Sequence, residues 1–202
     1  MGYVINKSYI NEIVVEKSRF IALLCPLTNE NDFDEYFKES KTTYKDARHY
    51  TYAFRYGNLE RASDDGEPQN TAGLPLLNLL KNHDLVNTAL IVIRYFGGKK
   101  LGAGRLLRTY VDAGNRVINI ADKFLEIPAF KYEITIPISD FERTRHYLEK
   151  DGFMIDDTDF SSLNVKVLVR VSKDQSESFE NLYNVVNKSE SVMLKECNDE
   201  QD

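Results

Sequence analysis

The stretch TALIVIRYFGGKKLGAGR, residues 88–105, decides the first part of the fold because it joins a strand, a turn and a helix start. Residues 88–96 are too continuously apolar for a half-exposed strand, so they predict a central strand buried on both faces. The four glycines within residues 97–104 predict a tight turn. A helix is expected from about Arg105 to Ala121, with an apolar stripe that begins at Leu107.

The chain before this stretch predicts a hairpin, an aromatic strand and two helices. The hairpin takes residues 10–15 and 19–25, and the first helix ends at about Thr42. From His49 to Tyr56 every second residue is aromatic, so one face of that strand is expected to lie in the core. A second helix is expected to reach Asn82 from Thr71, which is its expected N-cap.

The chain after the stretch predicts a second domain. Pro128 marks the expected boundary, which gives domains of residues 1–126 and 129–202. The second domain reads strand, helix, strand, strand, helix, strand, with its last helix over 176–187 and its last strand over 191–194. This β-α-β-β-α-β order is typical of a ferredoxin-like unit. The fold class expected for the whole chain is two-domain α+β.

Composition excludes several protein classes. The chain has 202 residues, of which 42% are hydrophobic and 29% are charged, which is typical of a globular protein and not of a disordered one. No apolar run approaches the ~20 residues that span a bilayer, and the polar N-terminus does not fit a signal peptide. With only Cys25 and Cys197, a disulfide framework is not expected, so the cytoplasm is the expected compartment.

The net charge of -6 is distributed unevenly along the chain. Residues 1–120 hold 16 basic and 14 acidic side chains, a balance of +2, whereas residues 121–202 hold 10 and 18, a balance of -8. Residues 94–116 hold six basic side chains against Asp112 alone, a local balance of +5. Anions respond to nearby potential, so the local balance predicts an anion site better than the total does.

The glycine-rich turn and its cations form the predicted site for an anion or a nucleic acid. Backbone N–H groups at such a turn and at the following helix N-terminus suit phosphate. The spacing fits neither a Walker A loop nor a dinucleotide fingerprint. A structural turn with a solvated cationic face is an equally strong interpretation. The predicted set is Arg94, Gly97, Gly98, Lys99, Lys100, Gly102, Gly104, Arg105 and Arg108.

A second candidate site combines His49 with Asp64, Asp65 and Glu67. Three carboxylates within four residues could bind a divalent metal or serve as acid and base. A structural role is favoured, in which the carboxylates cap backbone N–H groups or pair with the arginines that follow. For His49, a hydrogen-bonded structural histidine is the favoured interpretation.

Several motifs together resemble the YigZ/IMPACT family over about residues 15–121. They are Lys17-Ser18-Arg19-Phe20-Ile21, Ala47-Arg48-His49, Ser63-Asp64-Asp65-Gly66-Glu67-Pro68, Thr71-Ala72-Gly73-x-Pro75 and Arg94-Tyr95-Phe96-Gly97-Gly98-x-x-Leu101-Gly102. The resemblance implies a first domain like the second domain of a small-subunit ribosomal protein. It implies a second domain like the last domain of elongation factor G. It implies no defined enzymatic reaction.

Two positions depart from the family pattern. Gln69-Asn70 replaces the usual small residue and glycine, and Asn70 is expected to keep the turn because asparagine tolerates positive φ. Arg105 replaces a usual glycine, which makes the turn more cationic.

The favoured function is a non-catalytic protein that binds RNA or a ribosome-associated protein, with no cofactor and no membrane partner. A metal-dependent phosphohydrolase is one alternative, with Asp64, Asp65 and Glu67 holding a metal opposite a phosphate on the glycine turn. An acidic protein-interaction module in residues 129–202 is another.

Overall fold

A computed structural model describes residues 2–196 and divides the chain into two compact units. The first unit extends to Phe124, and the second spans Leu125–Lys195. Cys25 is buried with a free thiol, whereas Cys197 lies outside the described residues. In the part that is described, no helix is long and apolar enough to cross a membrane. The predicted α+β class with two domains is confirmed.

A five-stranded antiparallel sheet forms the centre of the first unit. Its central strand β6 is buried over Thr88–Arg94, so the predicted central strand is confirmed. The short strand β5 was not predicted, because its residues are mostly exposed and polar. The strand order is β2 (Tyr9–Val15), β3 (Ser18–Pro26), β6 (Thr88–Tyr95), β4 (His49–Tyr56) and β5 (Leu59–Ser63). A further short strand, β1 (Tyr3–Val4), bridges to Leu85 through Tyr3.

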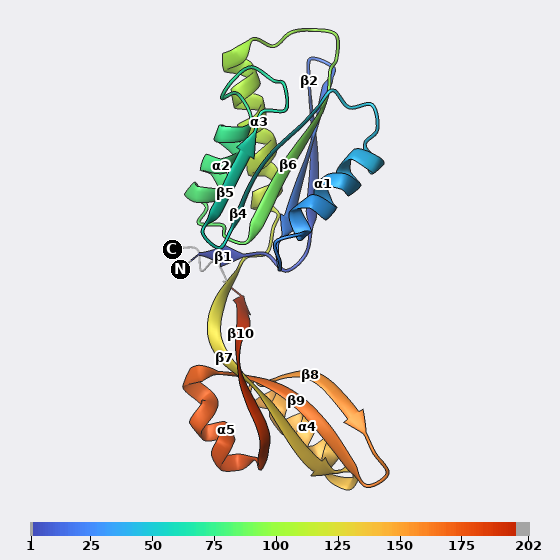
Figure 1. Cartoon of the computed structure of the whole chain (residues 1–202), viewed down its shortest axis with the longest axis vertical. Helices are drawn as coiled ribbons and strands as arrows, with labels where there is room; N and C mark the ends of the chain where they lie inside the picture. The colour runs from blue at the N-terminus through green and yellow to red at the C-terminus, as the bar shows by residue number, and fades with distance from the viewer. Residues whose placement is uncertain (1, 197–202) are drawn as a thin grey trace. The chain divides into compact units, whose positions relative to one another are not determined.

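Three helices cover the two faces of this sheet (Figure 1). Helices α2 (Gly73–Asn82) and α3 (Ala103–Asn119) pack on one face, and α1 (Asp32–Thr43) packs on the other. The aromatic face of β4 contacts the α1 side, where Phe33 stacks on Phe54 at 4.4 Å between ring centroids. Phe54 is buried and the three tyrosines of this face are half-buried against the same core, so the prediction is confirmed in part.

The start of α3 corrects two sequence predictions. The helix begins at Ala103 rather than Arg105, and its first buried apolar residue is Leu106, 4% exposed. Leu107 is 37% exposed and does not belong to the buried stripe. Leu106 and Tyr110 are four residues apart, so they share the helix face that is buried in the first turns of α3.

The second unit has the predicted β-α-β-β-α-β order. Its core is formed mainly by Tyr132, four valines of β9 and Phe179. Strand β9 pairs with β7 and β8, and β7 also pairs with β10. The elements are β7 (Phe124–Pro137), a 3-10 turn η1 (Ile138–Asp140), α4 (Phe141–Lys150), β8 (Met154–Phe160), β9 (Asn164–Ser172), a second 3-10 turn η2 (Lys173–Gln175), α5 (Ser176–Leu182) and β10 (Val185–Glu196).

The last two elements differ from their predicted bounds. Helix α5 ends at Leu182 because Tyr183 adopts extended backbone angles, and β10 begins at Val185. Two consecutive valines, Val185 and Val186, favour the strand there because β-branched side chains fit a strand better than a helix.

Candidate functional site

Four segments far apart in the sequence meet at one end of the first unit's sheet. His49 begins β4 and lies opposite Arg94 of β6 in the strand register. The turn between β5 and α2 brings Glu67 to the same place, and α3 contributes Tyr110. The sheet thus unites the two candidate sites of the sequence, one from the aromatic strand and acidic turn, the other from the glycine-rich turn.

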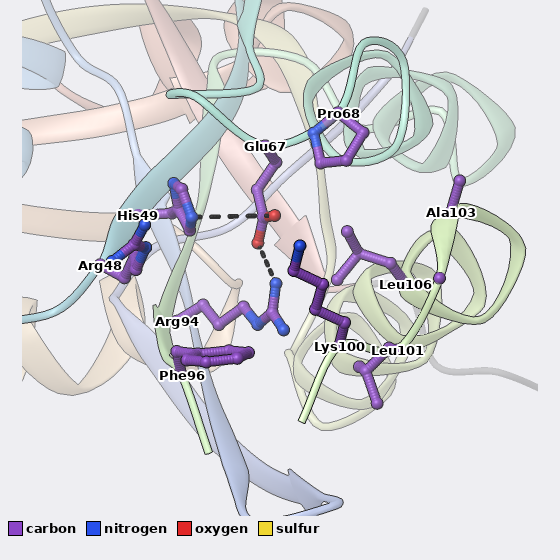
Figure 2. Close-up of a pocket in the computed structure, with 11 residues that line it drawn as sticks. Arg48, His49, Glu67, Pro68, Arg94, Phe96, Lys100, Leu101, Ala103 and Leu106 are labelled. Atoms are coloured by element: carbon purple, nitrogen blue, oxygen red, sulfur yellow. Dashed lines mark hydrogen bonds and ion pairs between the residues drawn. The ribbon is translucent and has the colours of Figure 1, made fainter. Parts of the chain in front are cut away.

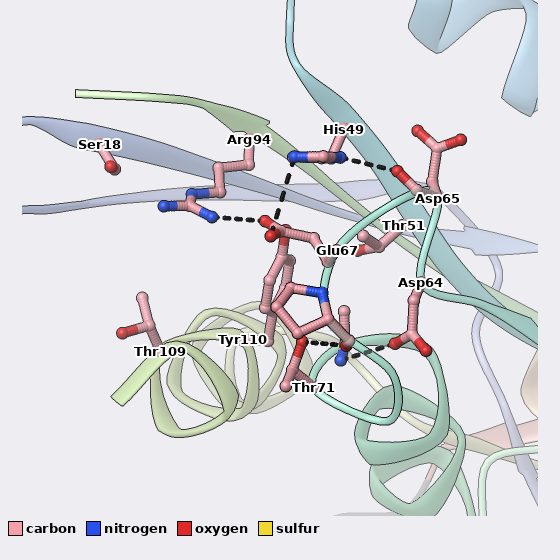
Figure 3. Close-up of polar contacts among 12 residues, drawn as sticks. Ser18, His49, Thr51, Asp64, Asp65, Glu67, Thr71, Arg94, Thr109 and Tyr110 are labelled. Atoms are coloured by element: carbon pink, nitrogen blue, oxygen red, sulfur yellow. Dashed lines mark hydrogen bonds and ion pairs between the residues drawn. The ribbon is translucent and has the colours of Figure 1, made fainter. Parts of the chain in front are cut away.

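Glu67 is the buried acceptor at the centre of this cluster (Figure 3). Its side chain is 4% exposed, and Oε1 accepts hydrogen bonds from Arg94 Nη1 at 2.6 Å and the Tyr110 hydroxyl at 2.8 Å. Burial, and then the Glu67 charge, raise the pKa of Tyr110, so its phenol stays protonated and donates. One carboxylate therefore connects the acidic turn, β6 and α3.

His49 lies on the other side of Glu67. Its Nδ1 is 2.7 Å from the Asp65 carbonyl oxygen. A carbonyl only accepts, so Nδ1 carries a proton and donates it. The second ring nitrogen, Nε2, faces Glu67 Oε2 at 3.8 Å, which is longer than a hydrogen bond. The prediction of a hydrogen-bonded histidine is confirmed.

Asp64 caps helix α2. Its Oδ1 accepts from the N–H groups of Ala72 and Gly73 at 2.9 and 2.8 Å, and Oδ2 accepts from Asn70 N–H at 2.8 Å. Thr71 is not the N-cap that the sequence suggested, since its hydroxyl donates to the Pro68 carbonyl instead. The capping role predicted for the carboxylates is confirmed at Asp64.

The acidic turn does not form the metal site that was considered as an alternative. Asp65 Oδ2 accepts from Tyr50 N–H at 2.6 Å, and the carboxylates of Asp64 and Asp65 point away from Glu67 (Figure 3). No group of three or more metal-ligating side chains gathers in residues 2–196. Backbone N–H groups engage two of the three carboxylates and Arg94 the third, so the triplet does not converge on one point.

The glycine-rich turn uses its glycines for two different reasons. Gly98 and Gly102 have φ of +88° and +77°, a region that favours glycine. Gly97 has the ordinary sign of φ, but a Cβ there would lie 2.2 Å from the Lys17 carbonyl carbon. Gly104 lies in the first turn of α3, where a Cβ would meet nothing closer than 4.0 Å. At the acidic turn, Asn70 adopts φ of +58°, as predicted.

The predicted cations fall into three groups. Arg94 is 5% exposed and held by Glu67, so it is a buried structural pair and not a free surface charge. Lys99 and Arg105 both bind Glu16, at 3.0 and 2.9 Å, and Lys99 and then Arg105 lower the pKa of that carboxyl. Within the described residues, Lys100 and Arg108 have no acidic partner.

A cavity of about 370 Å³ opens between the acidic turn, the end of β6 and the start of α3 (Figure 2). It has a charged wall and an apolar wall, and an exposed aromatic ring, Phe96, lies at its edge. The lining residues are Arg48, His49, Glu67, Pro68, Arg94, Phe96, Lys100, Leu101, Gly102, Ala103 and Leu106.

Sequence reasoning missed Glu16 and the polar role of Tyr110. Glu16 lies 83 residues from Lys99, and no local pattern connects the two. Tyr110 was expected only as part of the apolar stripe of its helix, and it does contribute its ring to the core. Its hydroxyl is a signal that was available, because a buried tyrosine hydroxyl usually finds a partner.

Comparisons with known proteins agree with the motifs. A family model of the Impact N-terminal domain matches residues 16–118. The IMPACT family member YvyE of Bacillus subtilis (strain 168) is 41% identical over 121 residues, which are 57% of this chain and 56% of YvyE. The chain thus matches little more than half the length of that relative. An IMPACT family member of Thermus thermophilus, named for the pol 5' region, is 31% identical over 147 residues, or 70% of this chain and 80% of that protein.

One solved structure matches nearly the whole fold. It is the crystal structure of a hypothetical protein, with 22% identity, a TM-score of 0.62 and coverage of 98% of both chains. At that identity the likeness concerns the fold alone. The matched domain model and the Thermus thermophilus relative establish the relationship, and this chain belongs to the IMPACT family.

Proposed function

We propose that this chain is a non-catalytic, translation-related protein that binds RNA, free or within the ribosome, through the cationic face around the start of α3. The observation that carries the proposal is the excess of positive charge on this face. Five cations, Arg48, Lys99, Lys100, Arg105 and Arg108, surround the pocket and the glycine-rich turn, and two of them, Lys99 and Arg105, share the half-buried carboxylate Glu16.

The start of α3 adds to this positive charge. Its first turn contains no acidic side chain and its N-cap, Gly102, offers no capping side chain. The first backbone N–H to bond within the helix is that of Leu106, so the amides before it are free to meet an anion. Phosphate oxygens are the acceptors that such a helix start and its neighbouring lysines and arginines bind in proteins.

The acidic second half of the chain supports placing the contact on the first unit. Residues 121–202 carry a balance of -8, which repels a phosphate backbone. Family membership, and the ribosomal-protein-like first domain that the family resemblance implies, favour a partner in translation, and we place its action in the cytoplasm.

The test is RNA binding by the full chain at low salt, measured by fluorescence anisotropy with single-stranded and structured RNA. Lys100→Ala with Arg108→Ala removes two unpaired cations and should weaken binding to all sequences alike. Lys38→Ala with Lys41→Ala removes the same charge from α1, on the opposite face of the sheet, and serves as the control. Absence of RNA binding by the parent, or equal losses in the two variants, would contradict the proposal.

A further inference from the structure

Glu67 Oε2 and His49 Nε2 face each other inside the pocket at 3.8 Å, which is too far for a direct hydrogen bond. Glu67 Oε1 accepts both of the hydrogen bonds that this side chain makes, whereas Oε2 accepts none. His49 Nε2 lies 3.8 Å from Oε2, and the proton of this imidazole is held at Nδ1. A neutral His49 therefore presents a lone pair to a carboxylate oxygen. This inner wall of the pocket suits a ligand that donates N–H groups.

The same wall contains a second polar atom that is not satisfied. Arg94 lines the pocket and is 5% exposed, and its Nε is buried without a hydrogen-bond partner. That atom has almost no accessible surface, so it is closed off from the pocket and a ligand there would not pair it. The unpaired groups that face the pocket are Glu67 Oε2 and His49 Nε2, and they are independent of the helix start on its other side.

The remaining walls offer a ring platform and a phosphate site. Phe96 is 44% exposed, and the Arg94 guanidinium lies 5.6 Å from the centre of its ring. Leu101 and Leu106 supply the apolar surface nearby. Lys100 directs its amino group into the pocket toward the side of Glu67, and Ala103, at the start of α3, lies on the opposite side (Figure 2).

We infer that the pocket holds one nucleotide, with the base against Phe96, the amino group of the base at Glu67 and His49, and the phosphate at the first amides of α3. The volume of about 370 Å³ lies at the small end of the range for small-molecule sites, which is about 300 to 1,000 Å³. A simple carboxylate would satisfy the cations but leave the two inner acceptors unpaired, and inorganic phosphate offers no ring to Phe96. A nucleotide supplies a donor edge, a flat ring and an anion together.

The nucleotide has two possible sources, a free mononucleotide or one nucleotide of an RNA strand. The second source rests on the proposed RNA-binding function, and the first does not. The experiment therefore uses both kinds of probe on the full chain.

Binding of AMP, CMP and UMP is measured by calorimetry, with adenosine, ribose 5-phosphate and inorganic phosphate as partial ligands. AMP and CMP, which carry an exocyclic amino group, should bind more tightly than UMP and more tightly than any partial ligand. Phe96→Ala should weaken AMP binding at least about fivefold, because base stacking on an aromatic side chain is lost. Phe160→Ala, an exposed phenylalanine of the second unit, is the matched control and should leave AMP binding unchanged.

Inorganic phosphate that binds as well as AMP, or AMP binding insensitive to Phe96→Ala, would overturn the inference. RNA binding that is also weakened by Phe96→Ala identifies the nucleotide of a strand as a source. RNA binding that persists without any mononucleotide binding or Phe96 effect overturns the pocket inference and leaves the proposed function intact. AMP binding without RNA binding supports the pocket inference and contradicts the proposed RNA-binding function.

Discussion

The two units of the chain use charged side chains in different ways. In the first unit, Glu67 is buried and bonds to Arg94 and Tyr110, which are 27 and 43 residues away. On α4 of the second unit, Arg145 pairs with Glu142 and Glu149 of the same helix, and all three are exposed. The first arrangement fixes three distant segments around a cavity. The second lies on the surface of one helix and connects no distant segments. The buried arrangement therefore indicates that the site lies in the first unit.

The largest effect is expected from breaking the buried pair. Arg94→Met leaves the Glu67 carboxylate buried without its cation, which should cost about 3 to 5 kcal/mol of stability. Arg145→Met should cost less than about 1 kcal/mol, because exposed ion pairs are weak. Hydrogen exchange of peptides from each unit, measured in rising urea, checks both values. Equal and small losses of stability in the two variants would show that the buried Arg94–Glu67 pair stabilises the fold no more than an exposed ion pair does.

Substituting the glycines of the glycine-rich turn by alanine should lower stability by different amounts and for different reasons. Gly97→Ala places a Cβ against the backbone of Lys17 and Ser18, so the strands must shift, at about 1 to 3 kcal/mol or more. Gly98→Ala meets open space and carries only the strain of positive φ, about 1 to 2 kcal/mol. Gly152→Ala in the second unit has the same open, positive-φ setting and is the control. Thermal melts that rank Gly98→Ala below Gly97→Ala in stability would contradict this assignment.

Helix capping gives a smaller contrast between the units. Asp64→Ala removes the acceptor for two N–H groups at the start of α2 and should cost about 0.5 to 2 kcal/mol. Asp140 precedes α4 but makes no side-chain capping hydrogen bond, so Asp140→Ala should change stability by about 0.5 kcal/mol or less. Urea unfolding midpoints of the two variants test the contrast, and a larger loss at Asp140 would reverse it.

The smallest stability effect concerns Glu16 and acid. Lys99 and then Arg105 lower the pKa of Glu16 from its ordinary value of 4.5. A carboxyl with a lowered folded-state pKa stabilises the fold above its unfolded-state pKa and loses that contribution as the pH falls through the folded value. Between about pH 5 and about pH 3, the parent should therefore lose slightly more thermal stability than Glu16→Gln. If the thermal stability of both proteins has the same pH dependence, protonation of Glu16 does not affect the stability of the fold.

The sequence predicts the order of elements well because hydrophobic periodicity is strong in β4 and α3 and because β6 is a continuous apolar run. Local signals also locate the acidic turn and the glycine-rich turn, and the positive φ of Asn70 follows from its residue type. Sequence reasoning fails where a contact depends on the sheet register. The register places His49 opposite Arg94. Glu67 and Tyr110 come to the same place from other elements, and no local pattern in the sequence connects the four residues.

A second kind of failure concerns charge. Six basic residues within 94–116 are apparent in the sequence, but their partners are not. Arg94 is neutralised by Glu67, and Lys99 and Arg105 share Glu16, which comes from the hairpin. Three cations of the predicted set are therefore paired with acidic side chains and are not free charges, and binding by the set stays a prediction.

The salt dependence of RNA binding tests the central claim most directly. Glu16→Gln frees Lys99 and Arg105, so the plot of log affinity against log salt should become steeper and RNA binding tighter. Lys100→Ala with Arg108→Ala should make the same plot shallower by ~0.7 for each lost phosphate contact with a single strand. If both variants keep the parent's slope and affinity, the cationic face of the first unit does not bind RNA and the account is wrong.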